Sequence, residues 1–182
     1  MSIIVNGTTI KKLFVNGTEC KEGYANGVKV FTSENVIYPG ASVKNLVANS
    51  GSYSTANFSF NVSGGINTNS TTLYIPINLT NISRLVITGR LYTSGQGAHS
   101  SIALIAKATF DSNIEYIYRY PYYFTVDGRY TERKLSLNGQ TINNPTIDVS
   151  SLTGNYYLVL GGYTNTYETV NATGNITKIV AE

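Results

Sequence analysis

Residues 85–92 read Leu-Val-Ile-Thr-Gly-Arg-Leu-Tyr, and their apolar and polar side chains alternate. One face of an extended chain carries Leu85, Ile87, Gly89 and Leu91, and the other carries Val86, Thr88, Arg90 and Tyr92. A period of two with one apolar face predicts a half-buried β-strand.

The same pattern recurs along most of the chain. It predicts strands over residues 58–62, 73–79 and 102–110, and further strands near 43–48, 113–126, 132–138, 155–163 and 174–180. Turn residues such as Ser63-Gly64-Gly65 and Asp127-Gly128 separate them. Pro76 favours an edge position or a bulge. No helix longer than a turn is predicted, so we expect an all-β fold, an antiparallel β-sandwich of the jelly-roll type.

The composition excludes several classes of protein. Only 13% of the 182 residues are charged, while 20 Asn, 22 Thr and 17 Ser supply the polarity, which argues against a helical bundle. We expect no membrane span and no secretory signal, because no apolar run is long enough. Cys20 and His99 are the single Cys and His, so we expect no zinc site and no disulfide. Phosphate-binding glycine loops are absent and the net charge is +3, so we expect no cofactor and no nucleic-acid partner.

The first thirty residues form a repeat of about ten residues. Each unit contains an Asn-Gly pair: Asn6-Gly7, Asn16-Gly17 and Asn26-Gly27. Asn-Gly between extended segments indicates a type I′ hairpin turn. We therefore predict a four-stranded β-meander over residues 2–31, which either docks onto another surface or belongs to the main fold.

Two stretches carry a resemblance to known proteins. The stretch ERKLSLNGQTINNPTIDVSSLTGNYYLVLGG, from Glu132 to Gly162, resembles the closing strands of sandwich domains in bacteriophage tail and baseplate proteins, which are similar in architecture to carbohydrate-binding modules. The Val-Asn-Gly-Thr opening is similar to the N-termini of small virion proteins from phages of Gram-positive bacteria. The resemblance implies a virion component of the tail, baseplate or capsid surface, made in the bacterial host cytoplasm. It assigns no functional residue.

Residues for catalysis are scarce. No Asp or Glu lies between Glu34 and Asp111, although a glycosidase needs two carboxyl groups close together. A hydrolase triad would have to use His99 with the adjacent Ser100 or Ser101, and adjacency in sequence is not triad geometry. Only four residues in the acid-free stretch are charged, which predicts a weakly basic surface or a neutral polar sheet: Lys44, Arg84, Arg90 and Lys107. We therefore expect no enzymatic activity.

The strongest candidate interface is aromatic. In a regular strand over 114–126, one face would carry Tyr116, Tyr118, Tyr120 and Tyr122, with Arg119 on the other. Such a tyrosine face suits stacking on sugars, a protein interface or the edge of the sandwich core, and the sequence leaves these alternatives open. A bulge at Pro121 would exchange the two faces.

Together these features predict two domains: residues 1–34 for attachment and residues 35–182 as the sandwich. The low surface charge favours a protein covered in an assembly, in a homo-oligomer or beside other virion proteins. We predict a non-enzymatic bacteriophage virion structural protein that attaches through its N-terminal meander. The alternative is a carbohydrate-binding module that recognises a host-surface glycan.

Overall fold

The computed structural model describes residues 3–5, 8–10, 13–15, 18–20, 22–25, 28–32, 35–48, 51–64, 69–119, 131–164 and 170–182. The chain divides into two compact units, Met1–Asn35 and Val36–Glu182. Each unit is described by itself.

The described part of the N-terminal unit consists of three β-hairpins. β1 (Ile3–Val5) pairs with β2 (Thr8–Ile10), β3 (Leu13–Val15) with β4 (Thr18–Cys20), and β5 (Glu22–Ala25) with β6 (Val28–Thr32). One Asn-Gly pair separates the two strands of each hairpin in the sequence, as predicted. The predicted meander is divided into three two-stranded sheets. The reason is that each ten-residue repeat closes on itself, so the repeating unit is a hairpin and not a strand shared by two hairpins.

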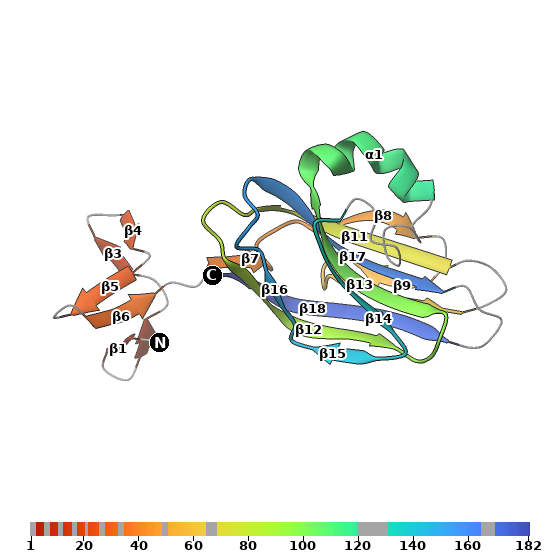
Figure 1. The fold of residues 1–182 in the computed structure, drawn as a ribbon. Coiled ribbons are helices and arrows are strands. Elements are labelled where there is room, and N and C mark those ends of the chain that lie inside the picture. The colour runs from red at the N-terminus through yellow and green to blue at the C-terminus, as the bar shows by residue number, and fades with distance from the viewer. Residues whose placement is uncertain are drawn as a thin grey trace. The chain divides into compact units, whose positions relative to one another are not determined.

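Two antiparallel sheets build the C-terminal unit (Figure 1). The five-stranded sheet has the order β14 (Arg133–Asn138), β13 (Ala98–Ala106), β17 (Asn155–Thr164), β11 (Asn69–Asn78) and β8 (Lys44–Ala48). The seven-stranded sheet follows the path β15 (Thr141–Asn143), β12 (Arg84–Thr93), β18 (Asn171–Ala181), β10 (Ser59–Ser63) and β9 (Ser52–Ser54). Two more strands join it: β16 (Thr146–Asp148) pairs with β12, and β7 (Asn35–Tyr38) pairs with β18.

The chain crosses repeatedly from one sheet to the other. It does so between β7 and β8, β8 and β9, β10 and β11, β11 and β12, β12 and β13, β14 and β15, β16 and β17, and β17 and β18. This alternation is typical of a jelly roll, and it confirms the predicted all-β antiparallel sandwich. Pro76 meets the expectation of an edge position: the pairing of β8 with β11 ends at Tyr74, so among the described strands Pro76 has a neighbour on one side only.

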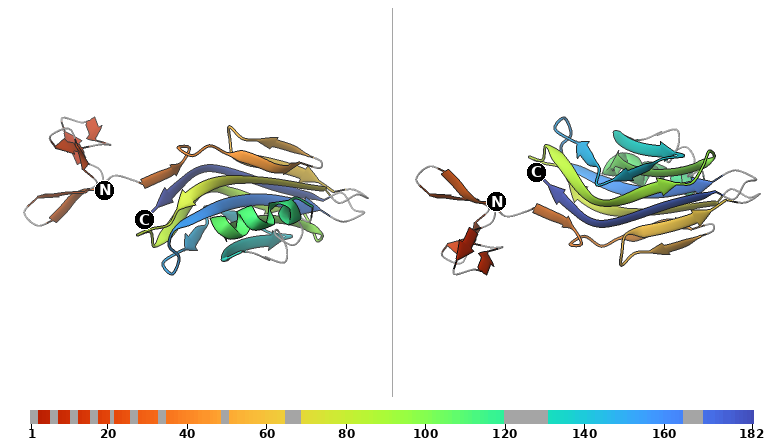
Figure 2. Two further views of the ribbon diagram at one scale, coloured as in Figure 1. Left: turned by 90° about the horizontal axis from the view of Figure 1, so that it is seen from above. Right: turned by 90° about the horizontal axis from the view of Figure 1, so that it is seen from below.

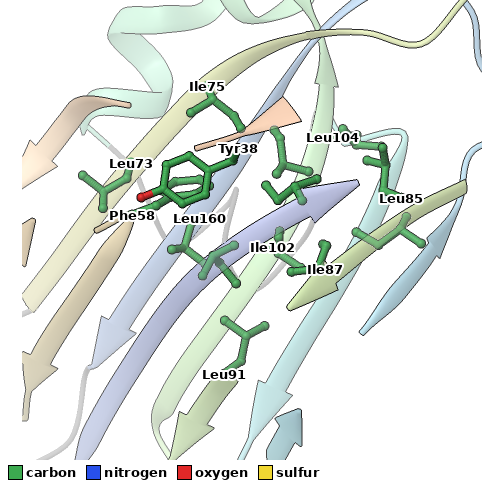
Figure 3. Close-up of a cluster of buried hydrophobic side chains, with 14 of the residues drawn as sticks. Tyr38, Phe58, Leu73, Ile75, Leu85, Ile87, Leu91, Ile102, Leu104 and Leu160 are labelled. Atoms are coloured by element: carbon green, nitrogen blue, oxygen red, sulfur yellow. The ribbon is translucent and has the colours of Figure 1, made fainter. Parts of the chain in front are cut away.

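Apolar side chains from both sheets fill the space between them (Figure 3). The predicted inward residues Leu85, Ile87 and Leu91 are fully buried. The Phe60 ring fits between the sheets because two positions beside it are glycine: Gly162 on the opposite sheet and Gly174, which pairs with Phe60 on the neighbouring strand. A Cβ atom on Gly162 would lie 2.1 Å from Phe60 Cε2, and one on Gly174 would lie 2.5 Å from Phe60 Cε1.

One helix replaces a predicted strand. β13 ends at Ala106, and α1 (Lys107–Arg119) begins at the next residue. The strand predicted over 102–110 is therefore wrong after Ala106, the strand predicted near 113–126 is wrong up to Arg119, and the expectation of no helix longer than a turn is wrong. Residues 120–126 lie outside the described residues. The helical period is visible in retrospect: Phe110 and Ile117, two turns apart, are each 1% exposed. They pack on Ala103, Ile105 and Val159, so α1 covers part of the outer face of the five-stranded sheet (Figure 2).

Candidate functional site

The tyrosine-rich segment does not provide the predicted row of rings up to Arg119. Tyr116 is half-buried on α1, where positions two residues apart point to nearly opposite sides of the helix. Tyr118 and Arg119 lie in the last turn of α1. Tyr120 and Tyr122 lie outside the described residues, as do the predicted attachment residues Asn6, Gly7, Asn16, Gly17, Asn26 and Gly27.

A different surface gathers polar side chains in the open. We call it the open face: the outward side of β15, β12, β18 and β10. Strand register places its side chains in two rows. The first row is Asn143, Arg90, Asn175 and Ser59, and the second is Thr141, Tyr92, Thr173 and Asn61. The rows are about 7 Å apart and cross four strands, a span of about 14 Å.

The open face is accessible. Asn143, Arg90, Asn175, Thr141 and Asn61 are exposed, and the rest of the two rows is half-buried. Within the described part of the chain, the Asn and Thr side chains of both rows make no hydrogen bond. Their amide and hydroxyl groups are therefore free to bind a ligand.

The edge strand β15 is fixed to β12 at both ends. The Asn144 main-chain N–H donates to the Gly89 carbonyl over 2.8 Å, and Asn144 Oδ1 accepts from the Gly89 N–H over 3.0 Å. Asn144 has φ +48°, a conformation that Asn tolerates. At the other end, the Thr93 N–H donates to the Gln140 carbonyl and the Gln140 N–H donates to Thr93 Oγ1. These bonds hold the β15 side chains against those of β12.

A buried serine supports the second row from behind. The Ser100 side chain of β13 is fully buried, and its Oγ lies 2.9 Å from the Tyr92 carbonyl oxygen and 3.1 Å from that of Thr173. Tyr92 and Thr173 are directly paired, so one hydroxyl ties the five-stranded sheet to both strands beneath the row. This contact fixes the backbone from which the row projects.

A bulge lies beside the first row. The register of β12 and β18 shifts between Thr88 and Gly89, and the Thr177 hydroxyl donates to the Thr88 carbonyl over 3.1 Å. Gly89 is required here because a Cβ would lie 2.3 Å from the Asn175 carbonyl oxygen. Bulges next to binding sites commonly re-aim a side chain, and this one directly precedes Arg90.

The charge on the open face is positive near Arg90. The Arg90 guanidinium carbon lies 5.0 Å from the centre of the Tyr92 ring, and no described residue forms an ion pair with it. Arg84, at the other end of β12, pairs with Glu182. Within the strands of the seven-stranded sheet, the single carboxylate is that of Asp148, which lies opposite Arg84. Hydrogen bonds from the Ser150 N–H and hydroxyl lower the pKa of Asp148.

The outer face of the five-stranded sheet offers a weaker candidate. Two adjoining hollows of about 350 Å³ each lie where α1 begins, and both are lined by Lys107 and Asn155. Lys107 is already paired with Asp111, and Asn155 Oδ1 accepts a hydrogen bond from Asn78 Nδ2 over 2.9 Å. These groups satisfy one another, so they leave less for a ligand than the open face does.

The triad considered from the sequence is not assembled. Ser100 points into the sandwich, while His99 and Ser101 share the outward side of β13 about 7 Å apart, beyond hydrogen-bond reach. Burial lowers the pKa of half-buried His99, and nearby Lys134 lowers it further. The described residues contain no group of three or more His, Cys, Asp or Glu that would suit a metal ion. No helix among them is long and apolar enough to cross a membrane.

Comparison with known proteins gives little. No family model matches the sequence, and no curated protein matches it. Among solved structures, the chain is similar to one described as TmCBM61 in complex with beta-1,4-galactotriose, with a TM-score of 0.36 and 11% identity over 82% of this chain and 86% of that one. A TM-score this low carries no argument about function. None of these comparisons supports the expected bacteriophage setting, which stays a prediction.

The sequence contained a partial signal for the open face. Arg90 and Tyr92 already stood together on the polar side of the strand predicted over 85–92. Their partners were not predictable, because Asn143 and Asn175 reach them only through strand pairing far apart in sequence.

Proposed function

We propose that the C-terminal unit is a carbohydrate-binding β-sandwich that holds a glycan on its open face. The observation that carries this proposal is the pair of exposed Arg90 and half-buried Tyr92, surrounded by amide and hydroxyl side chains that make no hydrogen bonds among the described residues. Sugar hydroxyls both donate and accept hydrogen bonds, and Asn and Thr side chains can accept from them and donate to them. Two rows across four strands give such a ligand an extended surface to lie on.

The support of the face favours a preformed site. Asn144 and Thr93 fix its edge strand, and Ser100 fixes the backbone beneath Tyr92. A rigid surface loses less conformational entropy on binding, and so retains more of the free energy of its contacts. We propose binding and not hydrolysis, because these side chains are hydrogen-bonding groups while glycosidases act through paired carboxyl groups.

A glycan array probed with the full chain tests the proposal. The parent protein should bind a subset of polysaccharides, and the double variant Arg90→Ala, Tyr92→Ala should bind them at least about tenfold more weakly. Tyr53→Ala is the matched control, because this tyrosine is 46% exposed on β9 outside both rows. Binding unchanged in the double variant, or a parent that binds no glycan, would contradict the proposal.

A second proposal concerns the N-terminal unit, and its separate compactness supports it. We propose that the three hairpins attach the sandwich to an assembly, as in a bacteriophage virion. Mass photometry of the full chain and of residues 36–182 tests this. The full chain should form higher oligomers, while the shorter chain should melt at the same temperature and stay monomeric. A shorter chain that unfolds would make the hairpins part of the fold and not an attachment element.

A further inference from the structure

We propose that the open face recognises the carboxylate of an acidic polysaccharide, a polymer that contains uronic acid residues. This inference rests on the proposed function and narrows it to one class of glycan. It is drawn from the first row of the open face, in which Asn143 and Asn175 stand on either side of Arg90.

The first row is a line of hydrogen-bond donors. Directly opposite residues in antiparallel strands have Cβ atoms about 4.5–5.5 Å apart, so both amides lie next to the Arg90 side chain. A guanidinium offers five N–H groups in a planar fork, and each amide offers two more. A carboxylate has two oxygens that accept about four hydrogen bonds in one plane. One carboxylate over Arg90 is therefore able to take hydrogen bonds from all three side chains.

The charges around the row point to an anion. Arg90 has no carboxylate partner among the described residues. Asp148 and Glu182 lie at the other end of β12, beside Arg84. A neutral glycan would leave the charge of Arg90 uncompensated, whereas a uronate neutralises it.

Tyr92 positions the guanidinium. The cation lies 5.0 Å from the ring centre, a distance at which the ring attracts it. Arginine stacks on aromatic rings and binds carboxylates through two parallel hydrogen bonds, and lysine does neither as well. Substitution of Arg90 by Lys should therefore lose most of the binding although the charge is kept.

Affinity electrophoresis of the full chain tests the inference with three acidic polymers: polygalacturonate, alginate and hyaluronan. Each is compared with its methyl ester, which has the same sugar rings without the negative charge. At least one acidic polymer should bind, with an affinity at least about tenfold above that of its ester, because hydrogen bonds between charged groups contribute the most. Raising the salt concentration should weaken the binding.

Variants of the full chain locate the effect. Arg90→Gln and Arg90→Lys should each reduce the affinity for the acidic polymer about tenfold, without lowering the melting temperature. Arg84→Gln is the matched control on the same strand and should stay within about twofold of the parent, since Glu182 already neutralises Arg84.

Three outcomes would overturn the inference. One is binding of neutral glycans alone, which would leave the proposed function intact. Another is equal binding of the acidic polymer and its ester. The third is equal binding of a phosphate polymer such as teichoic acid, which would show attraction to any anion. A parent chain that binds no glycan of any kind would instead remove the proposed function.

Discussion

The two outer faces of the sandwich are both formed by antiparallel sheets, but a helix covers part of one face while the other is exposed to solvent. The five-stranded sheet carries Tyr74, Tyr157 and Val159 outward, and α1 packs on them through Phe110. The seven-stranded sheet carries Asn, Thr and Arg outward and is left open. The comparison shows that outward residue type decides whether a face is covered or presented: an apolar outward row recruits a helix, and a polar one stays in water.

The largest difference should appear when an aromatic ring is removed from each face. Phe110→Ala takes away a side chain that is 1% exposed and lies 4.6 Å, centre to centre, from the Tyr157 ring. We expect it to lower the free energy of unfolding by about 3–5 kcal/mol. Tyr92→Ala on the open face should cost about 1 kcal/mol. Urea unfolding measures both, and equal losses would mean that the open face is part of the core.

The next effect concerns the bulge that shapes the open face. Gly89→Ala places a Cβ 2.3 Å from a backbone oxygen of Asn175, which cannot turn away as a side chain can. The expected loss of stability is about 1–3 kcal/mol, with weaker glycan binding. Gly40→Ala is the milder comparison and should cost less, since its Cβ would lie 3.2 Å from the Ile37 carbonyl oxygen, tight but without overlap, and its φ is not positive. A Gly89→Ala protein with parental stability would show that the bulge is free to shift.

A gain in stability is expected on the covered face. The Thr72 hydroxyl is fully buried and has no hydrogen-bond partner among the described residues, and the same holds for Ser101. Both residues pair with Gly161, from opposite sides. Thr72→Val should raise the free energy of unfolding by about 1 kcal/mol, because an unsatisfied buried group is removed. Thr173→Val on the open face should change it by less than about 0.5 kcal/mol. Thermal unfolding measures both changes, and a lower stability of the Thr72→Val protein would contradict the interpretation that the Thr72 hydroxyl is unsatisfied.

The smallest effect is a pH dependence of the covered side. The pKa of His99 is lowered in the folded protein by burial and by Lys134, while the unfolded chain keeps a value of about 6.5. The unfolded state therefore binds the proton first, so stability is complete above pH 6.5 and declines as the pH falls below it. His99→Gln should remove this decline in melting temperature between pH 7.5 and 5.5. An unchanged decline would assign it to another group.

The sequence by itself determined the strands and their buried sides. Alternation in residues such as 85–92 is enforced by the two-residue period of an extended chain, so it predicted both the sandwich and its core positions. It also predicted the three N-terminal hairpins, because Asn-Gly between extended segments favours a tight turn, and the strands on either side of each pair do pair with one another. The sequence did not predict the helix over 107–119, because the spacing of apolar residues there fits a period of 2 as well as a period of 3.6. The packing of Phe110 and Ile117 on the five-stranded sheet favours the helix.

Tertiary structure alone decided the candidate site. The short strands β15 and β16 have too few residues to show a period. β15 is held by the hydrogen bond that Asn144 Oδ1 accepts from the Gly89 N–H and by the one that the Gln140 N–H donates to Thr93 Oγ1. Asn143, Arg90 and Asn175 come from three strands that are distant in sequence, and only strand register brings them into one row. Local preference is carried by the order of residues, whereas a binding surface depends on which strands become neighbours, and that is settled when the two sheets close on a shared core.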